Sequence, residues 1–156
     1  MIYLDNAATT KVSDEVIEEM LNYYSTHYSN SSSKHFFGQR NKHVLEDSRK
    51  EVAKLLNCSD SEIYFTSGAT ESINMAIRGY VQANIDKGSH IITSTVEHKA
   101  VLETCKFLET IGVDVTYLNV DSNGLIDLKE LEDVITPETL LVSILWVNNE
   151  TGVIQD

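Results

Sequence analysis

The amino-acid sequence predicts an α/β fold with a mostly parallel sheet flanked by helices. Short β-branched and aromatic runs recur about every 25 residues, and a stretch with helical spacing of apolar residues separates each run from the next. The run at residues 140–147 is apolar at nearly every position. Such a run is typical of a strand buried on both faces, so we expect it at the centre of a helix-covered sheet with right-handed crossovers.

Two helices are predicted in the N-terminal third of the chain. Residues 2–4 have the pattern of a short strand, and the small and polar residues 5–10 are expected to form a loop. Ser13 is a suitable N-cap for the first helix. The apolar residues expected on the buried face of this helix are Val16, Ile17, Met20, Leu21 and Tyr24.

The second helix follows the Ser- and Asn-rich residues 25–34, which interrupt the helical pattern. It should extend from about Phe36 to Leu56. The residues expected on its buried side are Val44, Leu45, Val52, Leu55 and Leu56.

The rest of the chain alternates between strands and helices. The predicted strands are residues 63–66, 90–94, 113–120 and 140–147, and the predicted helices between them are residues 70–84, 98–111 and 128–134. Gly112 would close the second of these helices as a C′ residue. An Asn-Gly turn at residues 121–124 precedes the third helix, and Thr136-Pro137 ends it.

The composition excludes some classes of partner. Acidic residues outnumber basic residues 24 to 12, which gives a formal charge of −12 and opposes binding to nucleic acid or anionic membranes. No run approaches the roughly 20 apolar residues of a membrane helix, and the N-terminus lacks the pattern of a secretory signal. We therefore predict a cytoplasmic protein. Cys58 and Cys105 lack the spacing of a metal site or a disulfide framework, so no metal is expected.

Three polar loops follow the carboxyl ends of predicted strands: residues 67–70, 96–99 and 148–152. Ligands of open α/β sheets bind outside these ends, so the loops should converge on one rim. The first loop is also a strand-to-helix turn, where free backbone N–H groups favour an anion such as phosphate. The second offers the imidazole of His98, and the third offers the carboxamide of Asn149. The same residues also suit structural roles, His98 as a helix cap and Asn149 in a turn.

Four segments stand in the order and at the spacing of a known family: YLDNAATT at residues 3–10, FTSGATES at 65–72, EHKAV at 97–101 and VNNETG at 147–152. They resemble the motifs of the cysteine desulfurases, which are pyridoxal phosphate enzymes of the class V aminotransferase group with the fold-type I architecture. The resemblance covers essentially the whole chain. It implies that residues 1–156 form a single incomplete domain, in which residues 1–35 precede the first part of the large cofactor-binding domain.

The resemblance implies a role for each of the three loops. Ala69 and Thr70 would supply backbone N–H groups, and Thr70 also its hydroxyl, to the phosphate of the cofactor. His98 would stack on the pyridine ring and shuttle protons. Asn149 would donate a hydrogen bond to the phenolic oxygen of the cofactor.

The resemblance also implies a substrate, a reaction and partners. The enzyme would convert L-cysteine to L-alanine and pass sulfur as a persulfide to an acceptor or scaffold protein, for iron-sulfur cluster or thiocofactor assembly. Asn6, Ala7 and Ala8 resemble the family's loop near the bound substrate. Lys99 does not stand at the position of the family's Schiff-base lysine, so we expect it to be structural or to face solvent.

The family's Schiff-base lysine, in a Ser-x-His-Lys segment, and its persulfide-forming cysteine have no counterpart in these residues. Cys58, near a helix end, and Cys105, within an apolar helix face, are unsuitable replacements. We therefore expect an N-terminal fragment that is catalytically inert and binds the cofactor weakly if at all. The half-sheet should expose apolar surface, so we expect self-association, and a homodimer for the full-length enzyme.

The residues leave other functions open. One is a non-catalytic binding or interaction module that keeps the fold, and another is a relative of the selenocysteine lyase type. A nucleotide-binding domain of Rossmann type is a third, but the Gly-x-Gly-x-x-Gly and Walker patterns are missing. A reading frame that continues past Asp156 into a Ser-x-His-Lys segment would exclude the module.

Overall fold

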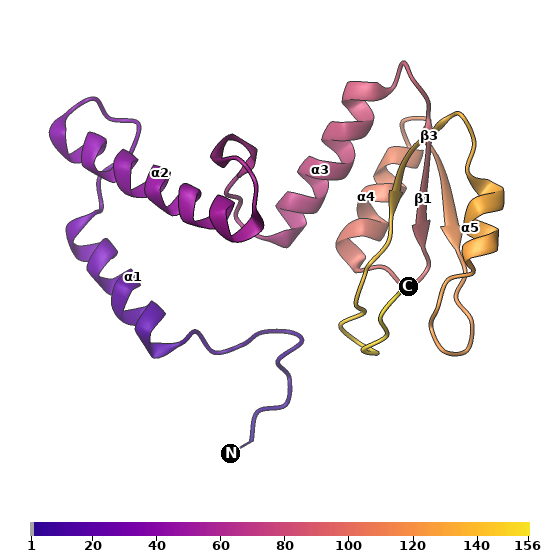
Figure 1. Ribbon diagram of the computed structural model, residues 1–156, viewed down its shortest axis with the longest axis horizontal. Helices are drawn as coiled ribbons and strands as arrows, with labels where there is room; N and C mark the ends of the chain where they lie inside the picture. Colours follow the sequence, from indigo (N-terminus) through magenta and orange to yellow (C-terminus); the bar gives the residue numbers. More distant parts are fainter. Residues whose placement is uncertain (1) are drawn as a thin grey trace. The chain divides into compact units, whose positions relative to one another are not determined.

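The computed structural model describes residues 2–156, which fall into two compact units that meet in sequence between Phe65 and Thr66. Figure 1 traces the helices and strands of each unit along the chain.

The first unit consists of helices joined by loops: α1 (Asp14–Thr26), α2 (Phe36–Leu56) and a short 3₁₀ turn, η1 (Asp60–Glu62). Ser13 caps α1 as predicted, because its side chain accepts a hydrogen bond from the N–H of Val16. His35 caps α2 in the same way, with Nδ1 accepting from the N–H of Gly38. The predicted bounds of the second helix are confirmed.

The predicted burial of these two helices is wrong. No residue of α1 is buried, and in α2 only Gly38 and Ala53 are buried. Leu55 and Leu56, which the helical pattern places on the buried side, are 84% and 63% exposed. The spacing identifies the apolar side of each helix, but within residues 2–65 this side is covered only in part, and Val44 and Val52 are half-buried.

The second unit is an α/β structure whose elements are α3 (Ala69–Asn84), β1 (His90–Ser94), α4 (Lys99–Glu109), β2 (Asp114–Leu118), α5 (Leu128–Val134) and β3 (Thr139–Ser143). The strand order is β2-β1-β3, and β1 pairs in parallel with both neighbours. Helices α4 and α5 contact β2, and α3 contacts β3; Figure 1 shows the sheet between α4 and α5. The predicted α/β fold with a parallel sheet flanked by helices is confirmed.

Three of the strand predictions are wrong. Residues 2–4, expected as a short strand, form none. Residues 63–66 pair with no strand in the described chain, and Tyr64 and Phe65 are exposed there. The last strand ends at Ser143, and it lies at an edge of the sheet instead of its centre. Among the described strands β3 pairs only with β1, and Val142 is exposed although the run around it is apolar.

The central strand, β1, contains polar residues whose groups are all engaged. The two ring nitrogens of His90 lie 2.8 Å from Thr139 Oγ1 of β3 and 2.9 Å from Thr116 Oγ1 of β2. The hydroxyl of Thr93 donates to the carbonyl of Ser143 at 2.8 Å. These bonds offset the cost of burying polar groups. His90 therefore links three strands.

The hydrophobic core of the second unit joins α3 and α4 to the sheet. Its buried members are Ile77, Val81, Ile91, Val101, Cys105, Leu108 and Val113. Leu108 of α4 has no exposed surface. The left-handed backbone of Gly112, with φ of 91°, follows α4 and lets the chain turn toward β2.

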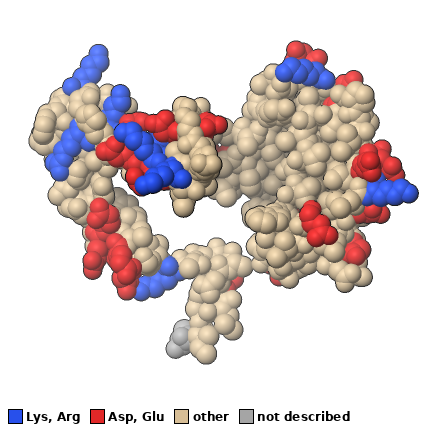
Figure 2. All heavy atoms as spheres, in the orientation of Figure 1, with Lys and Arg blue, Asp and Glu red and all other residues tan. Residues whose placement is uncertain are grey.

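Most of the charged side chains in the described residues are exposed. In Figure 2 acidic side chains appear in both units and are interspersed with basic ones. None of the helices described in residues 2–156 is long and apolar enough to cross a membrane.

Leu108→Ala should lower the free energy of unfolding by about 2–5 kcal/mol, because it leaves a cavity in a close-packed core. Leu128→Ala is the matched control, since Leu128 is more than half exposed at the start of α5. The control should lower stability by no more than about 1 kcal/mol. Urea denaturation followed by circular dichroism measures both. Equal losses would show that the core is not centred on α4.

We expect the two thiols to differ in reactivity. Cys58 is exposed, whereas Cys105 is 1% exposed. Burial, followed by the charges of Glu109 and Glu97, raises the pKa of Cys105 to about 11. Because the thiolate is the reactive form, a thiol reagent at about pH 8 should modify one thiol of the native chain rapidly and the second only after denaturation. Two rapidly reacting thiols in the native chain would contradict the burial of Cys105.

Candidate functional site

The N-terminus of α3 is the first component of the candidate site. Gly68 occupies its N-cap position and no side chain caps it, whereas side chains cap α1, α2, α4 and α5. The first N–H groups of a helix have no partner inside the helix, so those of Ala69 and Thr70 can bind a ligand. A Cβ placed on Gly68 would meet no atom within 4 Å, which shows open space beside this turn.

One carboxylate already lies at the same turn. Glu71 Oε2 accepts hydrogen bonds from the N–H and the hydroxyl of Ser67, both at 2.6 Å. These bonds lower the pKa of Glu71, so its carboxyl group is charged near neutral pH. The N–H of Ser67 is therefore engaged, whereas the N–H groups of Ala69 and Thr70 remain for an external anion.

His98 lies at the N-terminus of α4 and caps it. Its Nδ1 accepts a hydrogen bond from the N–H of Ala100 at 3.1 Å. The capping role that the sequence left open is thus confirmed. Since Nδ1 is an acceptor, the neutral ring carries its proton on Nε2. The side chain is exposed, and Nε2 is the nitrogen available to a ligand.

A pocket of about 340 Å³ lies where the N-terminal ends of α3 and α4 meet. The residues that line it are Thr70, Asn74, His98, Lys99, Ala100, Glu103 and Thr104. The structure therefore brings Thr70 and His98 together. The positive ends of two helix dipoles and the ammonium group of Lys99 favour an anion in this pocket, while the carboxylate of Glu103 opposes it.

Asn149 does not line this pocket. Its side chain is exposed, and Nδ2 donates to Glu150 Oε1 at 3.2 Å. Its loop is nevertheless tied to the loop before α4, because Asn148 Nδ2 donates to the carbonyl of Val96 at 3.0 Å. Asn148 also shapes the turn that follows it, because the N–H groups of Glu150 and Thr151 donate to its Oδ1.

Glu97 is a site residue that the sequence analysis did not assign. It is 7% exposed, and its Oε1 accepts from the N–H of Leu145 at 2.5 Å and from the hydroxyl of Ser94 at 3.3 Å. Burial raises the pKa of Glu97, although these hydrogen bonds act in the opposite direction. Its place beside His98 in the EHKAV motif was the only available signal, because the sequence does not show which glutamates are buried.

Asn6, Ala7 and Ala8 lie in the first unit. They form a turn in which the N–H groups of Ala8 and Thr9 donate to the carbonyl of Asp5 at 3.2 and 3.3 Å. The predicted loop is confirmed, and its proximity to a substrate stays a prediction.

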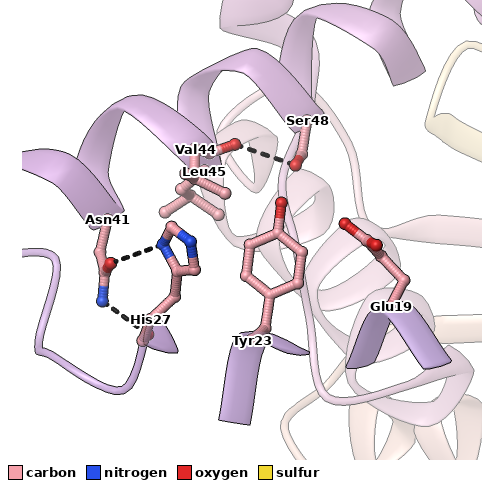
Figure 3. Close-up of a pocket in the computed structure, with 7 residues that line it drawn as sticks. All are labelled: Glu19, Tyr23, His27, Asn41, Val44, Leu45 and Ser48. Carbon is pink, nitrogen blue, oxygen red and sulfur yellow. Dashed lines mark hydrogen bonds between the residues drawn. The ribbon is translucent and has the colours of Figure 1, made fainter. Parts of the chain in front are cut away.

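A second pocket, of about 420 Å³, lies in the first unit between α1 and α2. Figure 3 shows its lining residues: Glu19, Tyr23, His27, Asn41, Val44, Leu45 and Ser48. His27 Nδ1 lies 3.2 Å from Asn41 Oδ1, and Asn41 Nδ2 donates to the carbonyl of His27 at 2.6 Å. These contacts hold the end of α1 to α2. Because no motif residue lines this pocket, we place the candidate site in the second unit.

Among residues 2–156, the structure arranges no group of three or more His, Cys, Asp or Glu side chains that could hold a metal ion.

The four motifs lie within longer similarities to known proteins. The family model described as aminotransferase class V matches residues 2–156. The cysteine desulfurase IscS of Methanosarcina thermophila is 50% identical over 154 residues, which are 99% of this chain and 38% of the relative. A solved NifS-like protein has a TM-score of 0.92 at 47% identity, and the match covers 96% of this chain and 41% of that one.

A solved structure titled "SspA in complex with cysteine" has a TM-score of 0.88 at 42% identity, over 96% of this chain and 43% of that one. This chain thus spans about two fifths of the length of the relatives that it matches. The resemblance to cysteine desulfurases extends beyond the four motifs to nearly every described residue. On the match to residues 2–156, the chain belongs to the class V aminotransferase family.

Proposed function

We propose that this chain forms the phosphate-binding end of the pyridoxal phosphate site in a cysteine desulfurase. The observation that carries the proposal is the pocket at the N-termini of α3 and α4, lined by both Thr70 and His98. Relatives named cysteine desulfurase, at 50% and 49% identity, support the reaction class. The reaction would convert L-cysteine to L-alanine and transfer the sulfur to an acceptor thiol, which becomes a persulfide.

The residues at the α3 N-terminus fit the phosphate of this cofactor. The N–H groups of Ala69 and Thr70 and the hydroxyl of Thr70 are donors, and the phosphate oxygens are charged acceptors. The open space beside Gly68 lets the phosphate approach the backbone closely. When bound, the cofactor supplies an electron sink that stabilises negative charge on the Cα of the amino acid.

His98 would contact the cofactor ring and carry a proton. The hydrogen bond from the N–H of Ala100 to Nδ1 restricts the orientation of the imidazole. The ring can then lie against a planar ligand, and Nε2 can hold or release a proton. A proton on Nδ1 would displace the capping hydrogen bond, so proton exchange is favoured at Nε2.

The remaining site residues belong to the same proposal. Asn149 would donate to the phenolic oxygen of the cofactor, and Asn6, Ala7 and Ala8 would lie near the substrate. A structural neighbour is titled as a complex with cysteine, which supports L-cysteine as the substrate of this family branch.

We place the protein in the cytoplasm, as a sulfur donor to an acceptor or scaffold protein in iron-sulfur cluster or thiocofactor assembly. The formal charge of −12 argues against nucleic acid and anionic membranes as partners. Exposed apolar side chains on α1 and β3, such as Leu21 and Val142, favour self-association, and a homodimer would cover such surface. Residues 1–156 would act as one incomplete domain.

Thr70→Val should weaken the binding of pyridoxal phosphate by roughly two- to tenfold, because it removes one hydroxyl donor and keeps the shape of the side chain. Thr70→Ser is the matched control, since it keeps the hydroxyl and should bind as the wild-type chain does. The fluorescence of Trp146, the only tryptophan, reports the titration, with excess inorganic phosphate as competitor. Saturable binding that responds neither to Thr70→Val nor to phosphate would contradict a phosphate site at the α3 N-terminus.

The reaction itself can be tested in a chimera of residues 1–156 with the part of the Methanosarcina thermophila relative that lies outside the match. Given pyridoxal phosphate, L-cysteine and a dithiol reductant, it should release equal amounts of alanine and sulfide. His98→Asn keeps a good N-cap but removes the imidazole, so turnover should fall by about 100-fold or more. A chimera whose absorbance shows bound cofactor but which forms no alanine would contradict the proposed function.

A further inference from the structure

Two loops carry the residues assigned to the cofactor. The β1 loop, residues 95–98, leads from β1 to His98, and the β3 loop, residues 144–149, leads from β3 to Asn149. Since β1 and β3 are neighbours in the sheet, the two loops begin beside each other. Each loop sends one side chain to the backbone of the other, and no assigned role accounts for either side chain.

From the β1 loop, Glu97 reaches the β3 loop. Its Oε1 accepts the N–H of Leu145, and the hydroxyl of Ser94 donates to the same oxygen. The carboxyl group is almost completely buried. A buried carboxyl group without hydrogen bonds would be costly, so the bond to Leu145 holds the two loops together while it satisfies Glu97.

From the β3 loop, Asn148 reaches the β1 loop. Its Nδ2 donates to the carbonyl of Val96, while its Oδ1 accepts the N–H groups of Glu150 at 2.9 Å and Thr151 at 3.0 Å. One side chain thus shapes the turn that carries Asn149 and also attaches that turn to the segment before His98.

The other end of the β3 loop is held by a separate set of contacts. The N–H of Gln155 donates to the carbonyl of Trp146 at 2.9 Å. The side chain of Gln155 accepts the N–H of Ile126 at 3.1 Å and donates to the carbonyl of Gly124 at 2.8 Å. These bonds attach the loop to the 121–126 turn and not to the β1 loop. The distance between His98 and Asn149 therefore depends on Glu97 and Asn148.

We propose that Glu97 and Asn148 are positioning residues, whose reciprocal hydrogen bonds fix the loop that carries His98 against the loop that carries Asn149. Neither residue touches the cofactor. We call this pair of hydrogen bonds, from Leu145 to Glu97 and from Asn148 to Val96, the clamp. Its existence is inferred from the contacts alone, whereas its role in placing His98 and Asn149 around a cofactor rests on the proposed function. The competing interpretation is that Asn148 only stabilises its own turn. In that case a substitution of Asn148 would affect only residues near 148–151.

Asn148→Asp separates these interpretations. Aspartate keeps the Oδ1 acceptor that the turn needs, but it lacks the Nδ2 donor to Val96. Glu97→Ala removes the other half of the clamp, and Glu97→Gln keeps an oxygen acceptor for the N–H of Leu145. Glu132→Ala is the matched control, because Glu132 is an exposed glutamate on α5.

The first measurement is amide hydrogen exchange of the ¹⁵N-labelled chain. Glu97→Ala should speed exchange of the Leu145 amide by about tenfold or more, and Glu97→Gln should largely restore protection. Asn148→Asp should also speed exchange at Leu145, while the control leaves it unchanged. Wild-type exchange at Leu145 in Asn148→Asp would overturn the proposal. If Glu97→Ala loses protection at the core residue Ile92 as well, the chain is unfolded and Asn148→Asp decides alone.

The second measurement is pyridoxal phosphate affinity, titrated as for Thr70→Val. Glu97→Ala should weaken binding several-fold, with rescue by Glu97→Gln. Removing a negative charge would by itself favour an anionic ligand, so weaker binding reports lost positioning and not altered charge. If a variant with faster exchange at Leu145 binds pyridoxal phosphate as tightly as the wild-type chain, Glu97 and Asn148 do not position the cofactor site. If the wild-type chain does not bind the cofactor, the same variants are compared in the chimera. A chimera without bound cofactor would instead overturn the proposed function, and the exchange data would still decide whether the two loops are held together by these hydrogen bonds.

Discussion

The parallel pairing of β1 with β3 is the constraint on which the candidate site depends. The register aligns Thr93 with Ser143, and the hydroxyl of Thr93 bonds to the carbonyl of that same partner. Both strands therefore leave the sheet at the same level, and the segments that follow them start side by side. Only because of this alignment can the side chains of Glu97 and Asn148 reach the neighbouring loop, and His98 then enters α4 from a fixed position.

The site suits an anion although the chain is strongly acidic. Surface charges are screened by salt over about 10 Å, whereas backbone N–H groups act at contact. The α3 end carries no side-chain cap, and α4 is capped by an imidazole, while the α5 end is capped by the carboxylate of Asp127. A carboxylate in the place of His98 would repel a phosphate in the shared pocket. The uncapped α3 end and the imidazole cap of α4 thus serve the same chemistry.

Local chemistry made the helices and the shared pocket predictable from sequence. The Ser13 cap and the helix at 128–134 depend on a few adjacent residues, and the meeting of Thr70 with His98 follows from the rule that places ligands beyond strand ends. Glu97 was not predictable in this way. Its main partner, the N–H of Leu145, is 48 residues away in the chain, and the burial that sets Glu97 apart from the other glutamates arises only when both loops are in place.

The prediction of which strand is central and buried failed for a different reason. Apolar spacing favoured the run at 140–147 as the central strand, yet the more polar β1 lies there. Burial stabilises an apolar side chain whichever element packs over it, because the hydrophobic effect is non-directional. The apolar residues of β3 therefore do not specify which elements of the fold lie beside them. His90 is more demanding, because it can be buried without cost only where both ring nitrogens find partners, and Thr116 and Thr139 supply them from opposite sides. The polar residues of β1 therefore specify its central position more strictly than the apolar residues of β3 could specify theirs.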